Sequence, residues 1–326
     1  MNPLSALFGA GVAIRNRLYD RGTLKVGKLS RPVVSVGNLR VGGSGKTPFV
    51  ILLSELLQDR QIAFDILTRG YGRKDTQIRL VDEGGSPTMF GDEPLLMAQR
   101  LGVPVIVGAD RFAAGQYAEH IFSEIQPAHG SQWLHILDDG FQHRRLFRDF
   151  DIVLVTAEDA TDTLLPFGRM REPLTSLHRT DAIVLSENAT LEGLPAFARE
   201  KHVWRVMRKL ETDGEVLSRP FAFCGIARPE RFTADLRKSG IELAGERFFP
   251  DHHFYTEADL QLLNALRRES GAGGFVTTEK DAVRLRAAGF WEQLEPIRAL
   301  ALRMELLDAP RVLDTLLGTL AERTRC

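Results

Sequence analysis

The sequence predicts an α/β fold, in which a doubly wound, mostly parallel sheet is followed by a second, smaller α/β domain. Two observations support this fold class. Short apolar runs rich in Val, Ile and Leu alternate with longer amphipathic stretches through the first two thirds of the chain, as βα units do. The runs are continuously apolar, which is typical of strands buried on both faces of a sheet. With 326 residues, 44% of them hydrophobic, the chain is long enough for two domains.

The predicted elements follow one another in this order. Residues 1–30 form an N-terminal amphipathic helix, residues 31–208 the first domain, residues 209–305 the smaller domain and residues 306–326 a C-terminal helix. In the first domain the predicted strands are 32–36, 63–67, 104–107, 133–137, 151–155 and 182–185, and the covering helices are 49–57, 92–101 and 113–125. In the smaller domain the strands are 221–226 and 274–277, and the helices are 229–239 and 258–268. The pattern loosens between residues 187 and 209, which we interpret as a connection.

Composition narrows the classes of partner. The 42 basic and 43 acidic residues nearly cancel, so no global field attracts nucleic acid, and we predict no nucleic-acid partner. The two cysteines, Cys224 and Cys326, form no CxxC pair. This cysteine usage indicates a reducing compartment and no structural zinc.

The first 22 residues carry apolar side chains at helical intervals, closely followed by Arg15, Arg17 and Arg21. Their apolar stretch is shorter than the roughly 20 residues needed to span a bilayer. No charged segment precedes it and no A-x-A-like site ends it, so we do not interpret it as a cleaved signal peptide. Two interpretations stay open from these residues alone. One is a helix lying in a membrane interface, with Phe8 and the leucines facing the lipid, and the other is a helix docked on the core.

A glycine-rich turn connects an apolar strand to a helix between residues 33 and 47, VVSVGNLRVGGSGKT. The turn contains Gly42, Gly43, Ser44 and Gly45. Its glycines allow backbone N–H groups to face phosphate oxygens, and the following helix adds its positive end. Lys46 then reaches the β- and γ-phosphates of a nucleotide, and the Thr47 hydroxyl is a ligand for Mg²⁺.

The turn departs from the GxxxxGK[ST] pattern at its first position, where this chain has Arg40 instead of glycine. The alternative to a phosphate site is a glycine-rich turn with an incidental GKT. The order of strand, turn, lysine, threonine and helix favours a core of the P-loop NTPase class.

Asp138 and Asp139 follow the predicted strand 133–137, in WLHILDDG. Ligands bind at the carboxyl ends of strands in open α/β sheets. Two adjacent carboxylates repel each other unless a cation or hydrogen bonds compensate, and Mg²⁺ is a natural compensation. An ordinary Asp-Asp-Gly turn is the alternative. Together with the phosphate loop, the pair is predicted to hold the metal.

Seven ordered motifs identify a family. They are VGNLRVGGSGKTP (36–48), TRGYGR (68–73), GDEP (91–94), DDGFQHR (138–144), GRMREP (168–173), FPDHHFY (249–255) and TTEKDAVR (277–284). Through them nearly the whole chain resembles the tetraacyldisaccharide 4'-kinases of lipid A biosynthesis. The resemblance implies ATP and Mg²⁺ as cofactors and transfer of the γ-phosphate to the 4'-hydroxyl of an acylated disaccharide 1-phosphate. It also implies that the protein acts at the cytoplasmic face of the inner membrane, which favours a membrane-associated N-terminal helix. No obligate protein partner is implied.

The resemblance also implies roles for single residues. Lys46 and Thr47 would hold phosphate and Mg²⁺, and the metal would further contact Asp138, Asp139 and Glu172. Asp92 would be the general base, paired with a histidine of the second domain; His252 and His253 are both candidates, and we favour His252. Arg171 would supply positive charge at the γ-phosphate, and Arg69 and Arg111 are further candidates for that role.

Each of these residues also has an ordinary structural interpretation. Asp92 suits a helix N-cap, the histidines suit a loop, and the arginines suit surface ion pairs. If the histidine lies in the second domain, the site is complete only when the domains close, so we expect closure on ATP binding. A P-loop ATPase or GTPase switch or metallochaperone without a lipid acceptor is the alternative function, and a non-catalytic membrane scaffold is another.

Overall fold

The computed structural model describes residues 2–123, 133–186, 188–212 and 217–325. The strands are β1 (Val33–Asn38), β2 (Phe64–Thr68), β3 (Arg79–Leu80), β4 (Val105–Val107), β5 (Leu134–Asp138), β6 (Phe150–Val155), β7 (Ala182–Leu185), β8 (His202–Thr212), β9 (Phe221–Cys224), β10 (Gly245–Phe248), β11 (Phe275–Thr278) and β12 (Ile297–Leu306). The α-helices are α1 (Pro3–Asp20), α2 (Lys46–Asp59), α3 (Pro87–Phe90), α4 (Asp92–Leu101), α5 (Arg111–Ile121), α6 (Pro229–Lys238), α7 (Glu257–Ser270), α8 (Glu279–Ala287) and α9 (Ala309–Arg325). Short 3₁₀ helices are η2 (Ala157–Ala160), η3 (Leu174–Arg179), η4 (Ala196–Glu200) and η5 (Glu292–Leu294).

The large unit is a doubly wound sheet centred on β1. Its order is β7-β6-β1-β5-β2-β4-β3, and every pair except β3–β4 is parallel. β1 and β5 are buried along their whole length, and their valines, leucines and isoleucine contribute to the core on both faces of the sheet. One face of the sheet packs against α2, α4 and α9, and the other packs against α5 and η3. The predicted α/β class and the predicted strands of this unit are confirmed, with end shifts of one or two residues.

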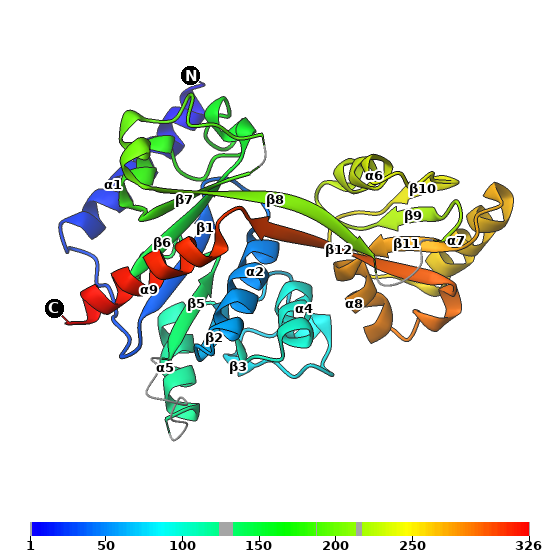
Figure 1. Cartoon of the computed structure of the whole chain (residues 1–326), viewed down its shortest axis with the longest axis horizontal. Helices are drawn as coiled ribbons and strands as arrows, with labels where there is room; N and C mark the ends of the chain where they lie inside the picture. The colour runs from blue at the N-terminus through cyan, green and yellow to red at the C-terminus, as the bar shows by residue number, and fades with distance from the viewer. Residues whose placement is uncertain (1, 124–132, 187, 213–216, 326) are drawn as a thin grey trace.

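The small unit contains β9, β10 and β11, which pair in parallel and continue into β12. It has its own core, in which aromatic rings meet edge to face. Phe223 contacts Phe249, Tyr255 and Phe275, with ring centroids 5.7 to 6.4 Å apart. Figure 1 shows this unit beside the large one, with α6 and α7 on its outside.

A two-stranded ribbon connects the two units (Figure 1). Residues 202–205 of β8 pair in parallel with β7, whereas residues 206–212 pair in an antiparallel arrangement with 300–306 of β12. We interpreted the region up to residue 209 as a connection, and its second part is in fact this long strand. The predicted boundary after residue 208 lies within β8. After β12, α9 returns to the core of the large unit through Val312, Leu313 and Leu316.

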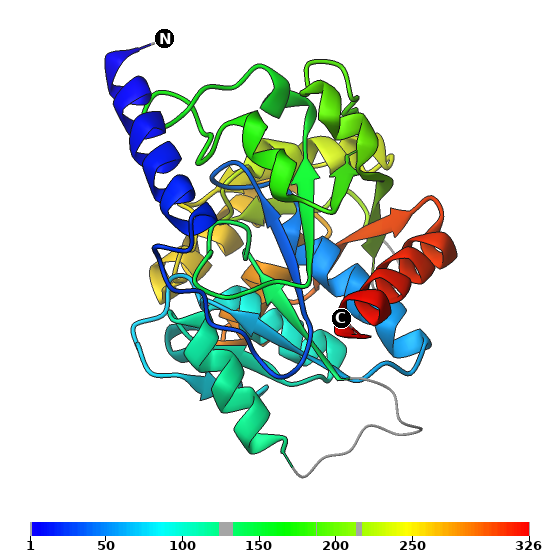
Figure 2. The same cartoon turned by 90° about the vertical axis from the view of Figure 1, so that its left-hand side faces the viewer.

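Helix α1 lies on the outside of the large unit (Figure 2). Asn2 caps its first turn, and Ser5 donates a hydrogen bond to the Leu164 carbonyl at 2.8 Å. Leu4, Leu7 and Ile14 are more than half exposed. No helix in the described part of the chain is both long enough and apolar enough to cross a membrane.

Candidate functional site

The phosphate loop lies between β1 and α2, at the carboxyl edge of the parallel sheet. Gly42, Gly43 and Gly45 have φ values of 76°, 46° and 86°, in the left-handed region that glycine adopts without strain. Helix α2 begins at Lys46, and its N-cap residue, Gly45, has no side chain to occupy the free N–H groups of the first turn. Those groups and the positive end of the helix dipole form an anion site.

Lys46 and Ser44 are oriented by Asn38, the last residue of β1. The Asn38 amide donates to Ser44 Oγ at 2.7 Å and accepts from Lys46 Nζ at 3.1 Å. Lys46 Nζ also lies 3.5 Å from Asp139 Oδ1. The phosphate loop and the carboxylate pair after β5, which are about 90 residues apart in the chain, are therefore adjacent in space.

Arg40, the departure from the glycine pattern, anchors the start of the loop. Its buried guanidinium contacts Asp159 at 3.3 Å and Asp162 at 3.1 Å, and it donates to Thr156 Oγ1 at 3.1 Å. These partners follow β6, on the far side of β1 from β5. The arginine side chain consequently fixes the loop to the neighbouring strand without entering the glycine turn.

Asp138 has one free oxygen at the carboxyl end of β5. Thr68 donates a hydrogen bond to Oδ2 at 2.9 Å, whereas Oδ1 is buried and has no protein partner. Burial, with further repulsion from Glu93 and Asp139, raises the pKa of Asp138 to about 7. A buried carboxylate oxygen without a partner at the edge that carries Thr47 fits a divalent cation.

Asp139 is held by cations. Arg171 donates to both its oxygens, at 2.8 and 3.1 Å. Burial opposes ionisation of this carboxyl, but Lys46 and Arg171 outweigh it and keep the pKa of Asp139 well below its ordinary value. Asp139 also has a φ of 49°, a conformation that costs free energy for a residue other than glycine and is common at functional sites.

Asp92 begins α4 and is contacted by two side chains of the small unit. His252 Nδ1 lies 3.0 Å from Asp92 Oδ2, and Arg284 donates to the same oxygen from Nη2 at 2.8 Å and Nε at 3.2 Å. Burial alone would raise the pKa of this carboxyl, but His252, Lys280 and Arg284 hold it well below its ordinary value. His252 has a φ of 58°, so this residue too is in a strained conformation.

The two candidate histidines have different partners. His252 meets Asp92 across the two units, whereas His253 Nε2 lies 3.0 Å from Asp259 Oδ2 within the small unit and its ring stacks on Phe249. The ring of Tyr71, from the TRGYGR motif, lies 5.3 Å from the ring of His252. The structure thus brings His252, and not His253, to Asp92.

Glu172 is not part of this site, and its predicted role as a metal ligand is corrected. The carboxylate is fully buried and contacts Arg15 at 3.3 Å, Asn16 at 2.9 Å and Arg179 at 3.0 Å. Residues 169–172 run beside residues 39–41, with backbone hydrogen bonds from Val41 to Arg169 and from Arg171 to Leu39. Because consecutive side chains of an extended segment point in opposite directions, Arg171 faces Asp139 and Glu172 faces α1. Arg15 accordingly turns inward instead of toward a membrane surface.

The other two candidate arginines differ in how deeply they are buried. Arg69 is exposed after β2, whereas Arg111 is buried as the first residue of α5 and donates to the Ala109 carbonyl at 2.7 Å. Burial lowers the pKa of Arg111, and the charges of Asp138 and Asp139 oppose that change. Among the described residues, no three His, Cys, Asp or Glu side chains gather into a metal cluster.

Sequence reasoning missed Arg284, which contacts the site from the small unit, and Met304, which contacts it from the connecting ribbon. Arg284 lies in the TTEKDAVR motif, which the resemblance contained without assigning it a role. Met304, on β12, lies so close to Gly45 that a Cβ there would be 2.3 Å from its Cε. No local sequence pattern predicts either contact, because each depends on how segments far apart in the chain pack together.

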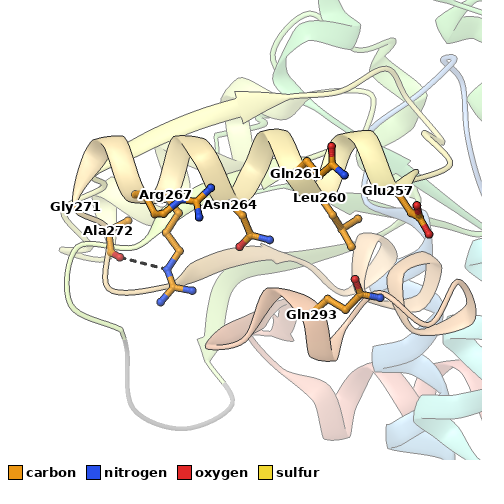
Figure 3. A pocket seen from close by; sticks show the side chains of 9 residues that line it. Glu257, Leu260, Gln261, Asn264, Arg267, Gly271, Ala272 and Gln293 are labelled. Carbon is orange, nitrogen blue, oxygen red and sulfur yellow. Dashed lines mark hydrogen bonds between the residues drawn. The ribbon is translucent and has the colours of Figure 1, made fainter.

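A separate pocket of about 810 Å³ lies along α7 and η5 in the small unit (Figure 3). Its lining includes Leu260, Asn264, Arg267 and Gln293 and none of the candidate site residues. Arg267 donates to the carbonyls of Ala272 at 3.5 Å and Glu295 at 3.1 Å, so its guanidinium closes the C-terminal end of α7.

Comparisons with known proteins agree with this geometry. The family model described as Tetraacyldisaccharide-1-P 4'-kinase matches residues 1–321. A curated tetraacyldisaccharide 4'-kinase of Koribacter versatilis is 48% identical, with 99% of each chain covered, and one of Geobacter metallireducens is 37% identical, with 96% of this chain and 95% of the relative covered. The solved structure of LpxK from Aquifex aeolicus in complex with ATP has a TM-score of 0.76 and 35% identity, and the match covers 98% of this chain and 97% of that one. The chain belongs to the tetraacyldisaccharide-1-P 4'-kinase family.

Proposed function

We propose that this protein transfers the γ-phosphate of ATP to the 4'-hydroxyl of a tetraacyldisaccharide 1-phosphate. The observation that best supports this is the contact between buried Asp92 and partly exposed His252, which joins the two units. The charge of Glu93, the neighbour of Asp92, helps to raise the pKa of Asp138, which is consistent with one site for the Asp92–His252 pair and Asp138. A nucleotide switch has no need of such an acceptor pair, and the curated relatives that match along their whole length are named kinases.

ATP is the proposed phosphate donor, and the phosphate loop would bind it. The N–H groups of residues 42–47 and the positive end of α2 would hold the phosphates, and Lys46 would contact the terminal ones. Arg171, which is fixed by Asp139, adds positive charge at the same place. Phosphoryl transfer depends on such positioning and charge more than on covalent chemistry.

Mg²⁺ fits the residues at this edge, and Thr47 with Asp138 would hold it. Bound there, it would neutralise charge on the phosphate oxygens. Asp139 was also predicted as a ligand, but Arg171 and Lys46 already engage it. Its role is then to orient those two cations.

The Asp92–His252 pair would accept the proton of the sugar hydroxyl. A carboxylate whose pKa is held so low is a weak base by itself. The hydrogen bond that His252 Nδ1–H donates to Asp92 raises the pKa of His252 above its ordinary value, although burial opposes the rise. The imidazole is thus the stronger base, and the carboxylate orients it and stabilises its charged form.

The acceptor lipid places the enzyme at a membrane surface, and we assign this contact to α1 at the cytoplasmic face of the inner membrane. Each CH₂ of an acyl chain removed from lipid costs about 0.8 kcal/mol, so the substrate remains in the bilayer. The exposed Leu4, Leu7 and Ile14 can enter the interface, and the exposed Arg17 and Arg21 can meet anionic headgroups.

A transfer assay tests the proposal. Wild type, Lys46→Ala and Asp92→Ala are incubated with γ-labelled ATP, Mg²⁺ and a tetraacyldisaccharide 1-phosphate. We expect labelled lipid from wild type and at least about 100-fold less from either variant, since Lys46 supplies charge at the transferred phosphate and proton acceptance is typically worth ~10² to 10⁴-fold. Lys238→Ala, an exposed lysine at the end of α6, is the matched control and should retain wild-type activity. The function would be refuted if wild type hydrolysed ATP at the same rate with and without the lipid and produced no labelled lipid.

A further inference from the structure

One loop of the small unit touches both halves of the site. Residues 225–228 connect β9 to α6. At the α6 end, Arg228 lies against the phosphate loop: a Cβ on Gly43 would be 3.0 Å from both Cδ and Nε of Arg228. Arg228 comes from the small unit, so this is a contact between units at the turn that faces the nucleotide phosphates.

The other end of the same loop supports the proton acceptor. The Gly225 carbonyl accepts hydrogen bonds from Arg284 Nη1 at 2.9 Å and from the backbone N–H of His252 at 3.1 Å. The Gly225 N–H donates to Asp281 Oδ1 at 3.0 Å. A Cβ on Gly225 would lie 3.0 Å from the Pro250 carbonyl, so the loop and the segment that carries His252 are in close backbone contact.

The charges around Arg228 suit an anion. Burial lowers the pKa of Arg228, and the nearby Arg40, Arg169 and Arg231 lower it further. Arg228 forms an ion pair with Glu158 at 3.8 Å. Glu158 is more than half exposed and also contacts Arg40 at 3.3 Å. A guanidinium remains protonated in such surroundings, and its planar fork matches phosphate oxygens.

We propose that Arg228 binds the β- and γ-phosphates of the nucleotide and that this contact, passed through Gly225, seats His252 and Arg284 on Asp92. Arg228 is then both a phosphate ligand and a positioning residue for the proton acceptor. Bound nucleotide would thereby stabilise the acceptor pair, in which His252 Nδ1 lies 3.0 Å from Asp92 Oδ2. This inference rests on the proposed function for its substrate but concerns nucleotide binding, so it can be tested without the lipid.

The first measurement is the equilibrium affinity for a non-hydrolysable ATP analogue with Mg²⁺, and for AMP, which lacks both phosphates. We expect Arg228→Ala to weaken binding of the analogue roughly tenfold or more, as loss of a charged hydrogen bond does, and to leave the affinity for AMP within about twofold. Arg228→Lys, which keeps the charge without the fork, should lie between the two. Arg231→Ala removes the same charge three residues further on and should behave as wild type.

The second measurement is amide hydrogen exchange in residues 249–255. The analogue should slow exchange there in wild type, Arg231→Ala and, in part, Arg228→Lys, but not in Arg228→Ala at saturating analogue. Unchanged affinity of Arg228→Ala for the analogue, or equal protection of 249–255 in that variant, would overturn the proposal. The lipid transfer assay on wild type is independent of these two measurements. If wild type transferred no phosphate to the lipid while the Arg228 variants still changed nucleotide affinity and exchange as expected, the proposed function would be refuted and this inference would stand.

Discussion

His252 and His253 are neighbours in the chain, yet they have different partners, and this makes them a natural pair of variants. His252→Gln removes the base that contacts Asp92, whereas His253→Gln removes a contact with Asp259 inside the small unit. We expect His252→Gln to lower kcat about 10²- to 10⁴-fold with an unchanged Kd for the ATP analogue. His253→Gln should change kcat only a few-fold. Equal losses of kcat in the two variants would contradict the assignment.

Arg40 explains how the loop works without its first glycine. Its guanidinium is the cation beside Asp159, which is fully buried, so removing it leaves a buried carboxylate without its ion-pair partner. Breaking a buried pair in this way costs about 3–5 kcal/mol. We therefore expect Arg40→Gly, which restores the glycine pattern, to lower the free energy of unfolding by that amount in denaturant titrations. Val41→Gly, at an exposed neighbouring position, should cost far less, and equal costs would show that backbone freedom and not charge is responsible.

His135 predicts a pH dependence of stability that has nothing to do with catalysis. Burial would lower the pKa of this imidazole, but Asp65 and Glu119 raise it to about 9. Since the folded pKa lies above the unfolded value of about 6.5, the stabilisation is complete below about pH 6.5 and is lost as the pH rises through about 9. The melting temperature of wild type should fall between about pH 7 and pH 10 more steeply than that of His135→Gln. His178→Gln, on the surface, should keep the wild-type slope; parallel curves for wild type and His135→Gln would rule the explanation out.

The site residues that could be predicted are those whose neighbours are local or belong to a motif. Lys46, Thr47 and Asp138 follow directly from a strand end and a turn, so their placement needs only the topology of the sheet. Glu172 was misassigned because its place next to Arg171 in the motif does not show which way its side chain points. In an extended backbone the side chains of these two neighbours point in opposite directions. No sequence pattern predicted a role for Arg228, because its contact with Gly43 joins residues about 185 positions apart in the chain.

At the level of elements, the buried strands could be predicted and the connecting ribbon could not. β8 and β12 alternate between apolar and charged residues: Trp204 and Val206 are buried, whereas Arg205 and Lys209 are exposed. Strands of this kind face solvent on one side, so a search for continuous apolar runs passes over them. The ribbon nonetheless fixes how far the small unit lies from the phosphate loop, because Met304 of β12 packs against Gly45.

Helix α1 gives a prediction at the same scale. Its inner face is fixed by Ser5 and by the contacts of Arg15 and Asn16 with Glu172, and its outer face carries exposed Leu7. Burying a leucine side chain is worth about 1.5–3 kcal/mol, so Leu7→Gln should weaken binding to anionic vesicles roughly tenfold or more in flotation assays. Leu262→Gln, an exposed leucine on α7 of the small unit, is the matched control. Equal binding of wild type and Leu7→Gln would remove α1 from the membrane contact.

For the molecule as a whole, ion pairs and apolar packing both join the two units, since Val283 of α8 is buried in the same hydrophobic core as Leu96 and Met97 of α4. Helix α4 of the large unit meets α8 of the small unit through the pairs Asp92–Arg284, Glu93–Lys280 and Arg100–Glu279. The Asp92–Arg284 pair is buried, but the other two are partly exposed and are therefore weakened by salt. Since His252 reaches Asp92 only while this contact holds, assembly of the proton acceptor and closure of the two units are the same event.

Lys280→Met tests this coupling by removing one of the partly exposed cations while keeping a side chain of similar length. Without nucleotide, small-angle scattering should give a larger radius of gyration for Lys280→Met than for wild type, because Glu93 then faces α8 without its partner. Raising the salt to about 1 M, where the Debye length falls to about 3 Å, should move wild type in the same direction. A non-hydrolysable ATP analogue with Mg²⁺ should return both proteins toward the compact profile, since the nucleotide adds attraction between the phosphate loop and Arg228 that the salt-sensitive pairs no longer supply. Lys238→Met, which removes an exposed lysine far from α4, should scatter as wild type does. Superimposable profiles in all these conditions would mean that the two units form one rigid body and that nucleotide binding does not assemble the Asp92–His252 pair.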